Sequence, residues 1–410
     1  MSGGAARAIR QYLDSERRAI LGLVEELVRI DSHATVPEGV NAVGDVVCRE
    51  LEAVGYATER ARGAPLGPEQ RWLEEFMLPG YDPSRLGDHR VVRKAGSGRG
   101  RVLLLGDLDT AYLPGGPRRF PFRVEGDRAY GPGIADMKGG LTVAVYALKA
   151  LEATGQNTLG EVVGVFSADE QAGSLSARQV IEPVARQAQW AFCMECAREG
   201  GNLLGSRAQI GVARLDVRGR DAHAGSAYAK GVSAIEAMAR KIIAIHALTD
   251  PAREIYLNVG IVNGGWRRSV VAGHCMAALD IRTPSAAAWD EVEAAVRLIA
   301  DTVDVPHSSA SLLIASHRPA VPWTEKTDRL IAITRAAGKA LGLEFGVLRS
   351  PAAGSSAFTG PLGIPCLDGM GPAGGDLMTD QEHVVISSLV ERAALLATTI
   401  HALGEGAWKA

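Results

Sequence analysis

Short apolar strands alternate with helix-length segments through the first half of this 410-residue chain. Residues 101–106 (RVLLLG), 161–166 (EVVGVF) and 190–194 (WAFCM) have the composition of strands that are buried on both faces. Residues 14–30 show the spacing of an amphipathic helix, and the alanine-rich segment 140–154 also favours helix. Strands that alternate with helices of this length predict an α/β domain with a mainly parallel sheet.

A different pattern occupies the middle of the chain, where apolar and polar residues alternate. Residues 212–218 (VARLDVR) and 276–282 (MAALDIR) show this alternation, which is typical of strands with one face toward solvent. With helical segments at 232–247 and near 290–304, and another alternating run at 311–316, the order becomes strand–helix–strand–strand–helix–strand. This order predicts a small α+β unit of the ferredoxin-like kind.

The parallel-sheet pattern returns near Trp323, with a helix predicted at 325–341, a strand at 344–348 and a final helix at 383–403. A chain of this length also exceeds what one hydrophobic core normally organises. We therefore predict a discontinuous α/β domain that is interrupted by an inserted α+β domain. The predicted bounds are 1–211 with 323–410 for the first domain and 212–322 for the inserted one.

The composition excludes several classes of protein. A net charge of −3 with scattered arginines argues against nucleic-acid binding, which needs basic stripes. No run approaches 18 consecutive apolar residues, and the first ten residues have no apolar core of the signal-peptide kind. The five cysteines are spread along the chain and suit a reducing compartment. We therefore expect a cytoplasmic protein that binds neither nucleic acid nor membranes.

Acidic residues follow the predicted strands at the points where the strands end. Taken singly, an acidic residue there is more often a helix cap or turn former than a ligand. Several in succession are expected to meet, because ligand groups gather at the carboxyl ends of strands in open α/β sheets. Carboxylates in one cleft repel each other unless a cation lies between them, so the clustering predicts a divalent metal. The residues are Asp107, Asp109, Asp136, Asp169, Glu170 and Glu195.

A series of motifs, taken in order, resembles the M20 family of metallopeptidases and aminoacylases, and the resemblance spans roughly residues 15–400. It implies a zinc-peptidase-like catalytic domain with an inserted lid or dimerisation domain. The glycine-rich motif is the most specific of the series. The motifs are GDLDT at 106–110, GPGIADMKGG at 131–140, SADEQAGS at 167–174, GRDAHAG at 219–225 and GPAGGDLMTDQEHV at 371–384.

The resemblance also implies which residues hold metal. Where family members place the ligands of one metal, this chain has Asp107, Asp136 and Glu195. At the remaining positions for a second metal it has Gln171 and Met378, and both a neutral amide and a thioether are poor ligands for a hard ion. We therefore expect a single divalent ion. An all-carboxylate set favours Mn²⁺, with Zn²⁺ and Co²⁺ as alternatives.

Three further residues receive catalytic roles from the resemblance. Glu170 matches the general base, which takes a proton from the attacking water and passes it to the leaving nitrogen. Asp109 is expected to orient a neighbouring group. His223 matches a histidine of the inserted domain that reaches a neighbouring subunit's active site, where it would stabilise an oxyanion. The competing interpretation of His223 is a surface or core histidine.

Other candidates concern substrate binding and the lost metal ligand. Arg282 and Arg268 are suited to bidentate bonds with a substrate carboxylate, and Asn258 is expected on the same face. Arginines at these positions equally suit solvated strand edges. His383 lies five residues beyond Met378, so it is a candidate replacement for the lost ligand, but a position at the start of the final helix is the favoured interpretation.

The resemblance leaves three functions open. The first is a hydrolase that cleaves a C–N bond of a small carboxylate-bearing molecule, working as a homodimer or larger homo-oligomer through the inserted domain. The second is a hydrolytic deaminase of an aromatic amine, as in the branch that resembles 5-nitroanthranilate aminohydrolase. The third is an inactive homologue that binds a ligand or partner. Retention of Glu170 argues against the third, since a binding protein needs no proton acceptor.

Overall fold

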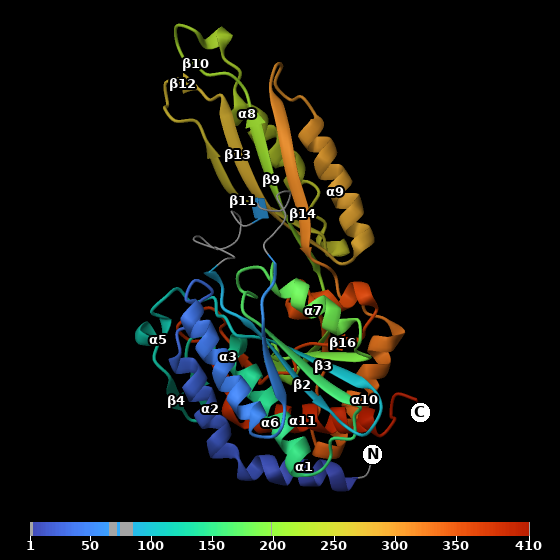
Figure 1. Ribbon diagram of the computed structural model, residues 1–410. Coiled ribbons are helices and arrows are strands. Elements are labelled where there is room, and N and C mark those ends of the chain that lie inside the picture. The colour runs from blue at the N-terminus through green and yellow to red at the C-terminus, as the bar shows by residue number, and fades with distance from the viewer. Residues whose placement is uncertain (1–2, 65–71, 74–84, 198, 410) are drawn as a thin grey trace. The chain divides into compact units, whose positions relative to one another are not determined.

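Figure 1 shows the computed structural model, which describes residues 3–64, 72–73, 85–197 and 199–409. The chain divides into two compact units. Unit 1 comprises Met1–Ser206, Val321–Ser350 and Gly354–Ala410, and unit 2 comprises Arg207–Ala320 and Pro351–Ala353.

Unit 1 is built on a six-stranded sheet in the order β1-β2-β6-β3-β7-β16. Strands β6, β3, β7 and β16 run parallel, whereas β1 and β2 join one edge antiparallel. The prediction of a mainly parallel central sheet is therefore confirmed. The strands are β1 (Ala57–Ala61), β2 (His89–Ala95), β3 (Arg101–Asp107), β6 (Glu161–Ser167), β7 (Trp190–Cys193) and β16 (Cys366–Leu367).

Helices cover both faces of this sheet (Figure 1). Val102 and Leu104 of β3 pack into the larger apolar core, and Leu103 and Leu105 pack into a second core on the other face. This alternation follows from the two-residue period of a strand, and it explains why β3 is apolar at every position from Val102 to Leu105. Residues of α1 (Gly3–Ser15), α2 (Arg17–Arg29), α3 (Pro37–Glu52), α6 (Gly139–Ala153), α10 (Glu325–Leu341) and α11 (Ile386–Gly404) contribute to the larger core, and those of α7 (Ala177–Ala185) and η6 (Ser355–Leu362) to the second.

Two predicted helices differ from the observed ones. The segment predicted as one helix at 14–30 contains the last two residues of α1 and all of α2, and the two helices meet at Glu16. The final helix was expected from residue 383 but begins at Ile386, because residues 383–385 form strand β18. That strand belongs to a small second sheet, of order β17-β18-β5-β4, made of β4 (Arg123–Glu125), β5 (Arg128–Tyr130), β17 (Gly374–Gly375) and β18 (His383–Val385).

The remaining elements of unit 1 are short. They include the turn η2, which carries the Asp136 motif, and the paired strands β8 and β15. Their bounds are α5 (Gly116–Arg119), η2 (Ile134–Lys138), η3 (Glu199–Gly201), β8 (Leu203–Arg207) and β15 (Val347–Ser350).

Unit 2 has a four-stranded antiparallel sheet in the order β11-β13-β9-β14. Helices α8 and α9 share an apolar core with the inward residues of β9 and β13, such as Leu215 and Leu279. The elements follow the predicted strand–helix–strand–strand–helix–strand order. The main ones are β9 (Gln209–Arg218), α8 (Ala234–His246), β11 (Tyr256–Gly264), β13 (His274–Thr283), α9 (Ala286–Asp301) and β14 (Ser309–Arg318), and the short ones are β10 (Ala222–His223), η4 (Tyr228–Lys230), η5 (Pro251–Arg253) and β12 (Val270–Val271).

Two further features concern membrane-spanning helices and the cysteines. Among the described residues, no helix is both long and apolar enough to cross a membrane. All five cysteines are free thiols and are buried.

Candidate metal centre

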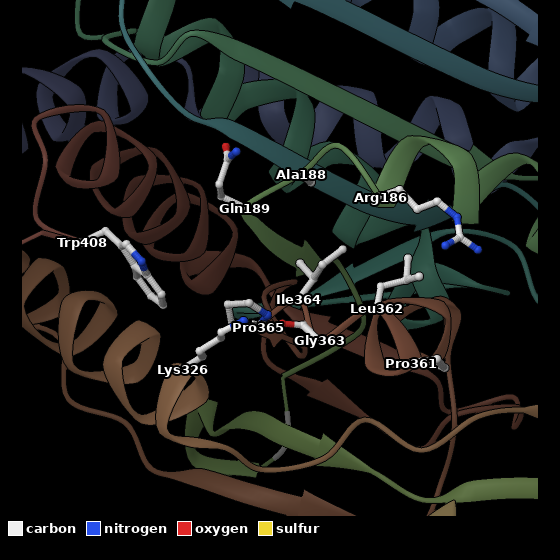
Figure 2. A pocket seen from close by; sticks show the side chains of 10 residues that line it. All are labelled: Arg186, Ala188, Gln189, Lys326, Pro361, Leu362, Gly363, Ile364, Pro365 and Trp408. Carbon is white, nitrogen blue, oxygen red and sulfur yellow. Dashed lines mark hydrogen bonds between the residues drawn. The ribbon is translucent and has the colours of Figure 1, made fainter.

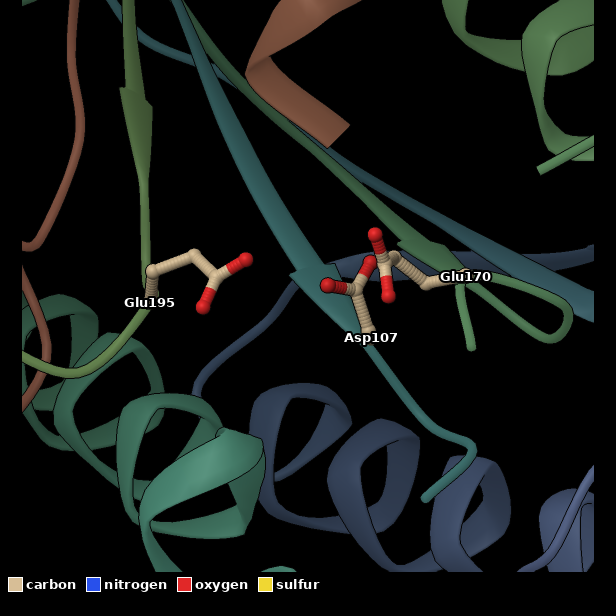
Figure 3. A group of neighbouring side chains, drawn as sticks. All are labelled: Asp107, Glu170 and Glu195. Atoms are coloured by element: carbon tan, nitrogen blue, oxygen red, sulfur yellow. The ribbon is translucent and has the colours of Figure 1, made fainter. Parts of the chain in front are cut away.

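Three carboxylates meet at the carboxyl ends of the central strands of unit 1. Asp107 is the last residue of β3, Glu170 follows β6, and Glu195 follows β7 (Figure 3). One oxygen of each carboxylate lies within 4.8 Å of one oxygen of the other two, and all three side chains are buried. Strands β3 and β6 end level, with Asp107 paired to Ser167, so the topology itself brings these residues together.

The two oxygens of Asp107 have different surroundings. Its Oδ1 accepts hydrogen bonds from the hydroxyls of Ser167 and Ser355, each at 2.6 Å. Its Oδ2 is buried and has no hydrogen-bond partner. Burial raises the pKa of Asp107 well above its usual range, and the charges of Glu170 and Glu195 raise it further. A buried carboxylate that has one oxygen without a donor and lies beside two more carboxylates fits a divalent cation.

Asp109 holds the loop that carries Glu170. Its two oxygens accept the backbone N–H groups of Glu170 and Gln171, both at 2.9 Å. Burial raises the pKa of Asp109 well above its usual range, and the charges of Glu170 and Asp169 add to this effect. Asp109, expected to orient a neighbouring group, therefore holds the loop that carries Glu170, the expected general base.

Asp169 belongs to the same loop but has a different role. It accepts the backbone N–H and the hydroxyl of Ser176, both at 2.8 Å, and the N–H of Ala177 at 3.2 Å, at the start of α7. The acidic residue therefore caps a helix. His89 of β2 also contacts this segment through Ser176 and through the N–H of Ala168. The loop is thus tied to neighbouring strands on both sides of Glu170.

Asp136 lies close to the three carboxylates without being one of that group. Burial raises its pKa well above the usual range, and the charges of Glu195, Glu170 and Glu382 contribute in that order. Its Oδ1 accepts a hydrogen bond of 3.1 Å from the side-chain amide of Gln171. The amide thus satisfies an oxygen that the resemblance assigns to a metal.

Glu382 is a site residue that sequence reasoning did not single out. Its Oε1 accepts the backbone N–H groups of Ala135 and Asp136 at 2.8 and 3.1 Å. Its Oε2 accepts the hydroxyl of Tyr112 at 2.7 Å and the N–H of Met378 at 3.2 Å. The fully buried carboxylate therefore holds the turn that carries Asp136. The available signal was its place in the closing family motif, four residues after Met378.

Neither Met378 nor His383, the two residues considered at the missing second-metal ligand, belongs to the group of three carboxylates. The side chain of Met378 is 59% exposed, on backbone in the left-handed region (φ 63°). His383 opens strand β18, where its Nδ1 lies 3.0 Å from the carbonyl of Gln381 and its ring packs on Tyr130, with 5.5 Å between ring centroids. The expectation that His383 begins the final helix is therefore wrong, since pairing with β5 extends the backbone there.

The candidates from the inserted segment all belong to unit 2. His223 is exposed, and its Nδ1 accepts the backbone N–H groups of Gly225 at 3.1 Å and Ser226 at 3.2 Å. An Nδ1 that accepts two hydrogen bonds leaves the ring proton of the neutral imidazole on Nε2. His223 therefore presents an exposed N–H donor.

The three substrate-binding candidates differ in their surroundings. Arg282 donates from Nε to Asp280 at 2.8 Å and from a terminal nitrogen to the carbonyl of Pro351 at 3.3 Å. Asn258 is exposed on β11, directly opposite Asp280 in the β11–β13 register. Arg268 is exposed in the loop between β11 and β12. The register places Asn258 and the Asp280–Arg282 pair on the same face of the sheet, because opposite residues of paired strands share a face.

A cavity of about 700 Å³ lies elsewhere in unit 1 (Figure 2). It is lined by Gln189 and Pro365, each of which directly precedes a strand of the central sheet, and by Lys326 and Trp408. The carboxylates follow the opposite, carboxyl ends of the strands, so this cavity is separate from the metal centre.

Comparison with known proteins identifies the family. A model of peptidase family M20/M25/M40 matches residues 103–402. The chain therefore belongs to this family, whose members are metal-dependent hydrolases that act on amide and peptide C–N bonds.

Individual relatives agree with this assignment. Carboxypeptidase G2 from Pseudomonas sp. is 28% identical over 402 residues, which cover 97% of this chain and 92% of the relative. Acetylornithine deacetylase from Myxococcus xanthus is 29% identical over 274 residues, or 63% of this chain and 65% of that protein.

Solved structures show the same fold at lower identity. A tripeptidase from Staphylococcus aureus has a TM-score of 0.76 at 18% identity and covers 95% of this chain and 99% of its own. A dinuclear metal-binding peptidase of the M20 family from Bacillus subtilis has a TM-score of 0.66 at 14% identity, with 96% and 99% covered.

Proposed function

We propose that this chain is a hydrolase that cleaves a C–N bond of a small carboxylate-bearing substrate with one divalent ion. The observation that carries the proposal is the cluster of Asp107, Glu170 and Glu195, in which Asp107 keeps a buried Oδ2 without a hydrogen-bond partner. Asp107 and Glu195 would hold the ion, with Asp136 beside them. Because every one of these side chains is a carboxylate, the centre suits a hard ion such as Mn²⁺.

The surroundings of Asp136 support one ion in place of two. A carboxylate that served two cations would need both of its oxygens as ligands. Here the amide of Gln171 donates to Asp136 Oδ1, and the thioether of Met378 is exposed. A neutral amide N–H at that oxygen replaces the cation as its partner, and a thioether is a poor ligand for a hard ion.

The protein's own groups divide the chemistry as follows. A bound divalent ion supplies Lewis-acid polarisation of the carbonyl and lowers the pKa of the attacking water. Glu170 accepts a proton from that water at its carboxylate and delivers it to the leaving nitrogen. Asp109 keeps Glu170 in place through its backbone N–H. The exposed Nε2–H of His223 would donate to the oxyanion that develops in the active site of a neighbouring subunit.

Unit 2 is proposed to bind the substrate carboxylate and to pair subunits. Arg268 and Asn258 offer exposed donors, and Arg282 forms an ion pair of 2.8 Å with Asp280. Exposed apolar residues such as Ile243 on α8 and Leu298 on α9 favour contact between copies of the chain. The free cysteines suit a reducing compartment such as the cytoplasm.

The decisive experiment combines metal analysis with activity. We expect the purified protein to bind one Mn²⁺ per chain and to hydrolyse members of a panel of N-acyl amino acids. Glu170→Gln is expected to lower kcat by about 10²–10⁴-fold while it keeps the ion, since only the proton acceptor is lost. Two tightly bound zinc ions per chain would contradict the one-ion proposal. Release of ammonia from aminobenzoates, with no amide cleaved, would assign the chain to arylamine hydrolysis.

A further inference from the structure

We propose that Ser167 and Ser355 are positioning residues that make Asp107 a one-oxygen ligand of the metal. The inference rests on the proposed function, because it assumes that the three-carboxylate centre binds an ion. It goes further by naming the groups that make Asp107 offer one oxygen to the ion and not two.

Both hydroxyls donate to the same oxygen of the same carboxylate. Ser167 Oγ and Ser355 Oγ each lie 2.6 Å from Asp107 Oδ1, and the two hydroxyl oxygens are 3.5 Å apart. Ser167 is the last residue of β6, and Ser355 is the first residue of η6, so the donors come from separate segments. All three side chains are buried, so both donors to Oδ1 come from the interior of the protein.

Two donors occupy the accepting capacity of Oδ1. A carboxylate oxygen offers about two lone-pair sites, and each hydroxyl supplies one proton. Hydrogen bonds to an ionised carboxylate are about twice as strong as neutral ones, so replacing both of them at Oδ1 with a metal bond costs free energy. Oδ2 is left buried and without a partner, and it is therefore the oxygen that faces the ion.

This arrangement has a consequence for metal choice. Large ions such as Ca²⁺ take six to eight oxygens and often use both oxygens of one carboxylate. With Oδ1 held by two serines, Asp107 can offer a single oxygen. The serines therefore favour a smaller ion with fewer ligands, such as Mn²⁺, over Ca²⁺. A histidine at this position would itself present one ligand atom, so the two hydroxyls give a carboxylate the same one-atom character.

The chain contains a matched control for the test. Ser356 is the next residue of η6, and its hydroxyl is also buried and donates to a carboxylate, at 2.6 Å from Asp368 Oδ2. Ser356→Ala removes a hydroxyl of the same kind from the same segment but leaves Asp107 untouched. Ser355→Thr keeps a hydroxyl at the tested position.

The experiment measures the Kd for Mn²⁺ by electron paramagnetic resonance on metal-free protein, with Ca²⁺ competition as a second reading. We expect the Kd to rise by about 10–100-fold in Ser167→Ala/Ser355→Ala, less in each single variant, and not in Ser356→Ala. The ratio of the Kd for Ca²⁺ to the Kd for Mn²⁺ should fall in the double variant. Ser355→Thr, which keeps a hydroxyl, should bind Mn²⁺ with the affinity of the unsubstituted protein. Thermal unfolding of the metal-free variants checks that they are folded.

Two outcomes separate this inference from the proposed function. If the double variant binds Mn²⁺ within about twofold of the unsubstituted protein while Asp107→Asn abolishes binding, the serine inference is overturned and the metal centre stands. If the unsubstituted protein binds no ion, the proposed function fails and the inference fails with it.

Discussion

Glu170 and Gln171, two neighbouring residues after β6, differ in what they bring to the carboxylate cluster. Glu170 adds a third carboxylate to Asp107 and Glu195. Gln171 adds a neutral amide that donates to Asp136 at 3.1 Å. Changing the amide to a carboxylate would replace a donor with a second negative charge beside a buried acceptor. In the proposed one-ion centre, the amide of Gln171 therefore takes the place of a second cation beside Asp136 Oδ1.

This contrast leads to a prediction at the residue scale. Gln171→Glu combined with Met378→His places a carboxylate and an imidazole, both good ligands for a divalent metal, at the two positions that the resemblance assigns to a second metal. We expect the metal content to rise from one to two ions per chain, as measured by elemental analysis after gel filtration. Gln179→Glu, an exposed change of the same kind at the edge of α7, should leave the content at one. A double variant that still holds one ion would show that other features exclude the second.

At the scale of elements, the last helix holds the loops behind the metal centre. Arg392 of α11 is buried and donates to the carbonyls of Gly371 at 3.0 Å, Gly369 at 2.6 Å and Gly201 at 3.1 Å. Gly371 in turn donates its N–H to the carbonyl of Glu195 at 2.9 Å. Burial lowers the pKa of Arg392 to about 10, so its charge is retained at neutral pH. Helix α11 thus fixes the backbone on which Glu195 stands.

A second buried cation organises unit 2 and supports a stability prediction. Lys241 of α8 donates to the carbonyls of Ile299, Ala300 and Thr302 at the end of α9 and pairs with Asp304 at 2.9 Å. Lys241→Met leaves these acceptors without their donor. We expect it to lower the free energy of unfolding by about 3–5 kcal/mol, measured by urea titration.

The adjacent residue provides the control for that measurement. Arg240 forms an exposed ion pair with Glu236 on the same helix. Arg240→Met should change stability by less than about 0.5 kcal/mol, because exposed pairs of this spacing contribute little. Equal effects of the two substitutions would show that the buried contacts of Lys241 do not stabilise unit 2.

At the scale of the whole molecule, the buried carboxylates of the candidate metal centre lower the free energy of unfolding unless a cation is bound to them. Asp107 and Asp136 are buried, and their pKa values are raised by burial and by neighbouring carboxylates. Anything that binds the folded state alone stabilises it, by about 2.7 kcal/mol at a ligand concentration 100 times its Kd. We therefore expect a chelator to lower the Tm and Mn²⁺ to restore it.

The same measurement on a ligand variant tests where this stabilisation arises. In Asp107→Asn the Tm should no longer respond to Mn²⁺, because the oxygen that faces the ion has become part of a neutral amide. A response equal to that of the unsubstituted protein would place the stabilising ion at another site.

Much of the fold and part of the site were predictable from local sequence. Apolar strands alternating with helices indicated the parallel sheet, because burial on both faces requires a continuous apolar run. Asp107, Glu170 and Glu195 stood out because each follows such a strand, and parallel strands end at one edge. The final helix was placed too early, since the pairing of residues 383–385 with β5 leaves no mark in local periodicity.

The sequence by itself therefore determined the sheet, the family motifs and the carboxylates at the strand ends. Only the tertiary structure decided which oxygens those carboxylates have to offer. Ser355 lies 248 residues from Asp107, and Glu382 lies 247 residues from Ala135, whose N–H it accepts. A hydrogen bond between such distant segments depends on how the whole chain packs, so no local sequence pattern predicts it. The partnering of Asp107 and Asp136, and with it the single-ion proposal, rests on those long-range contacts.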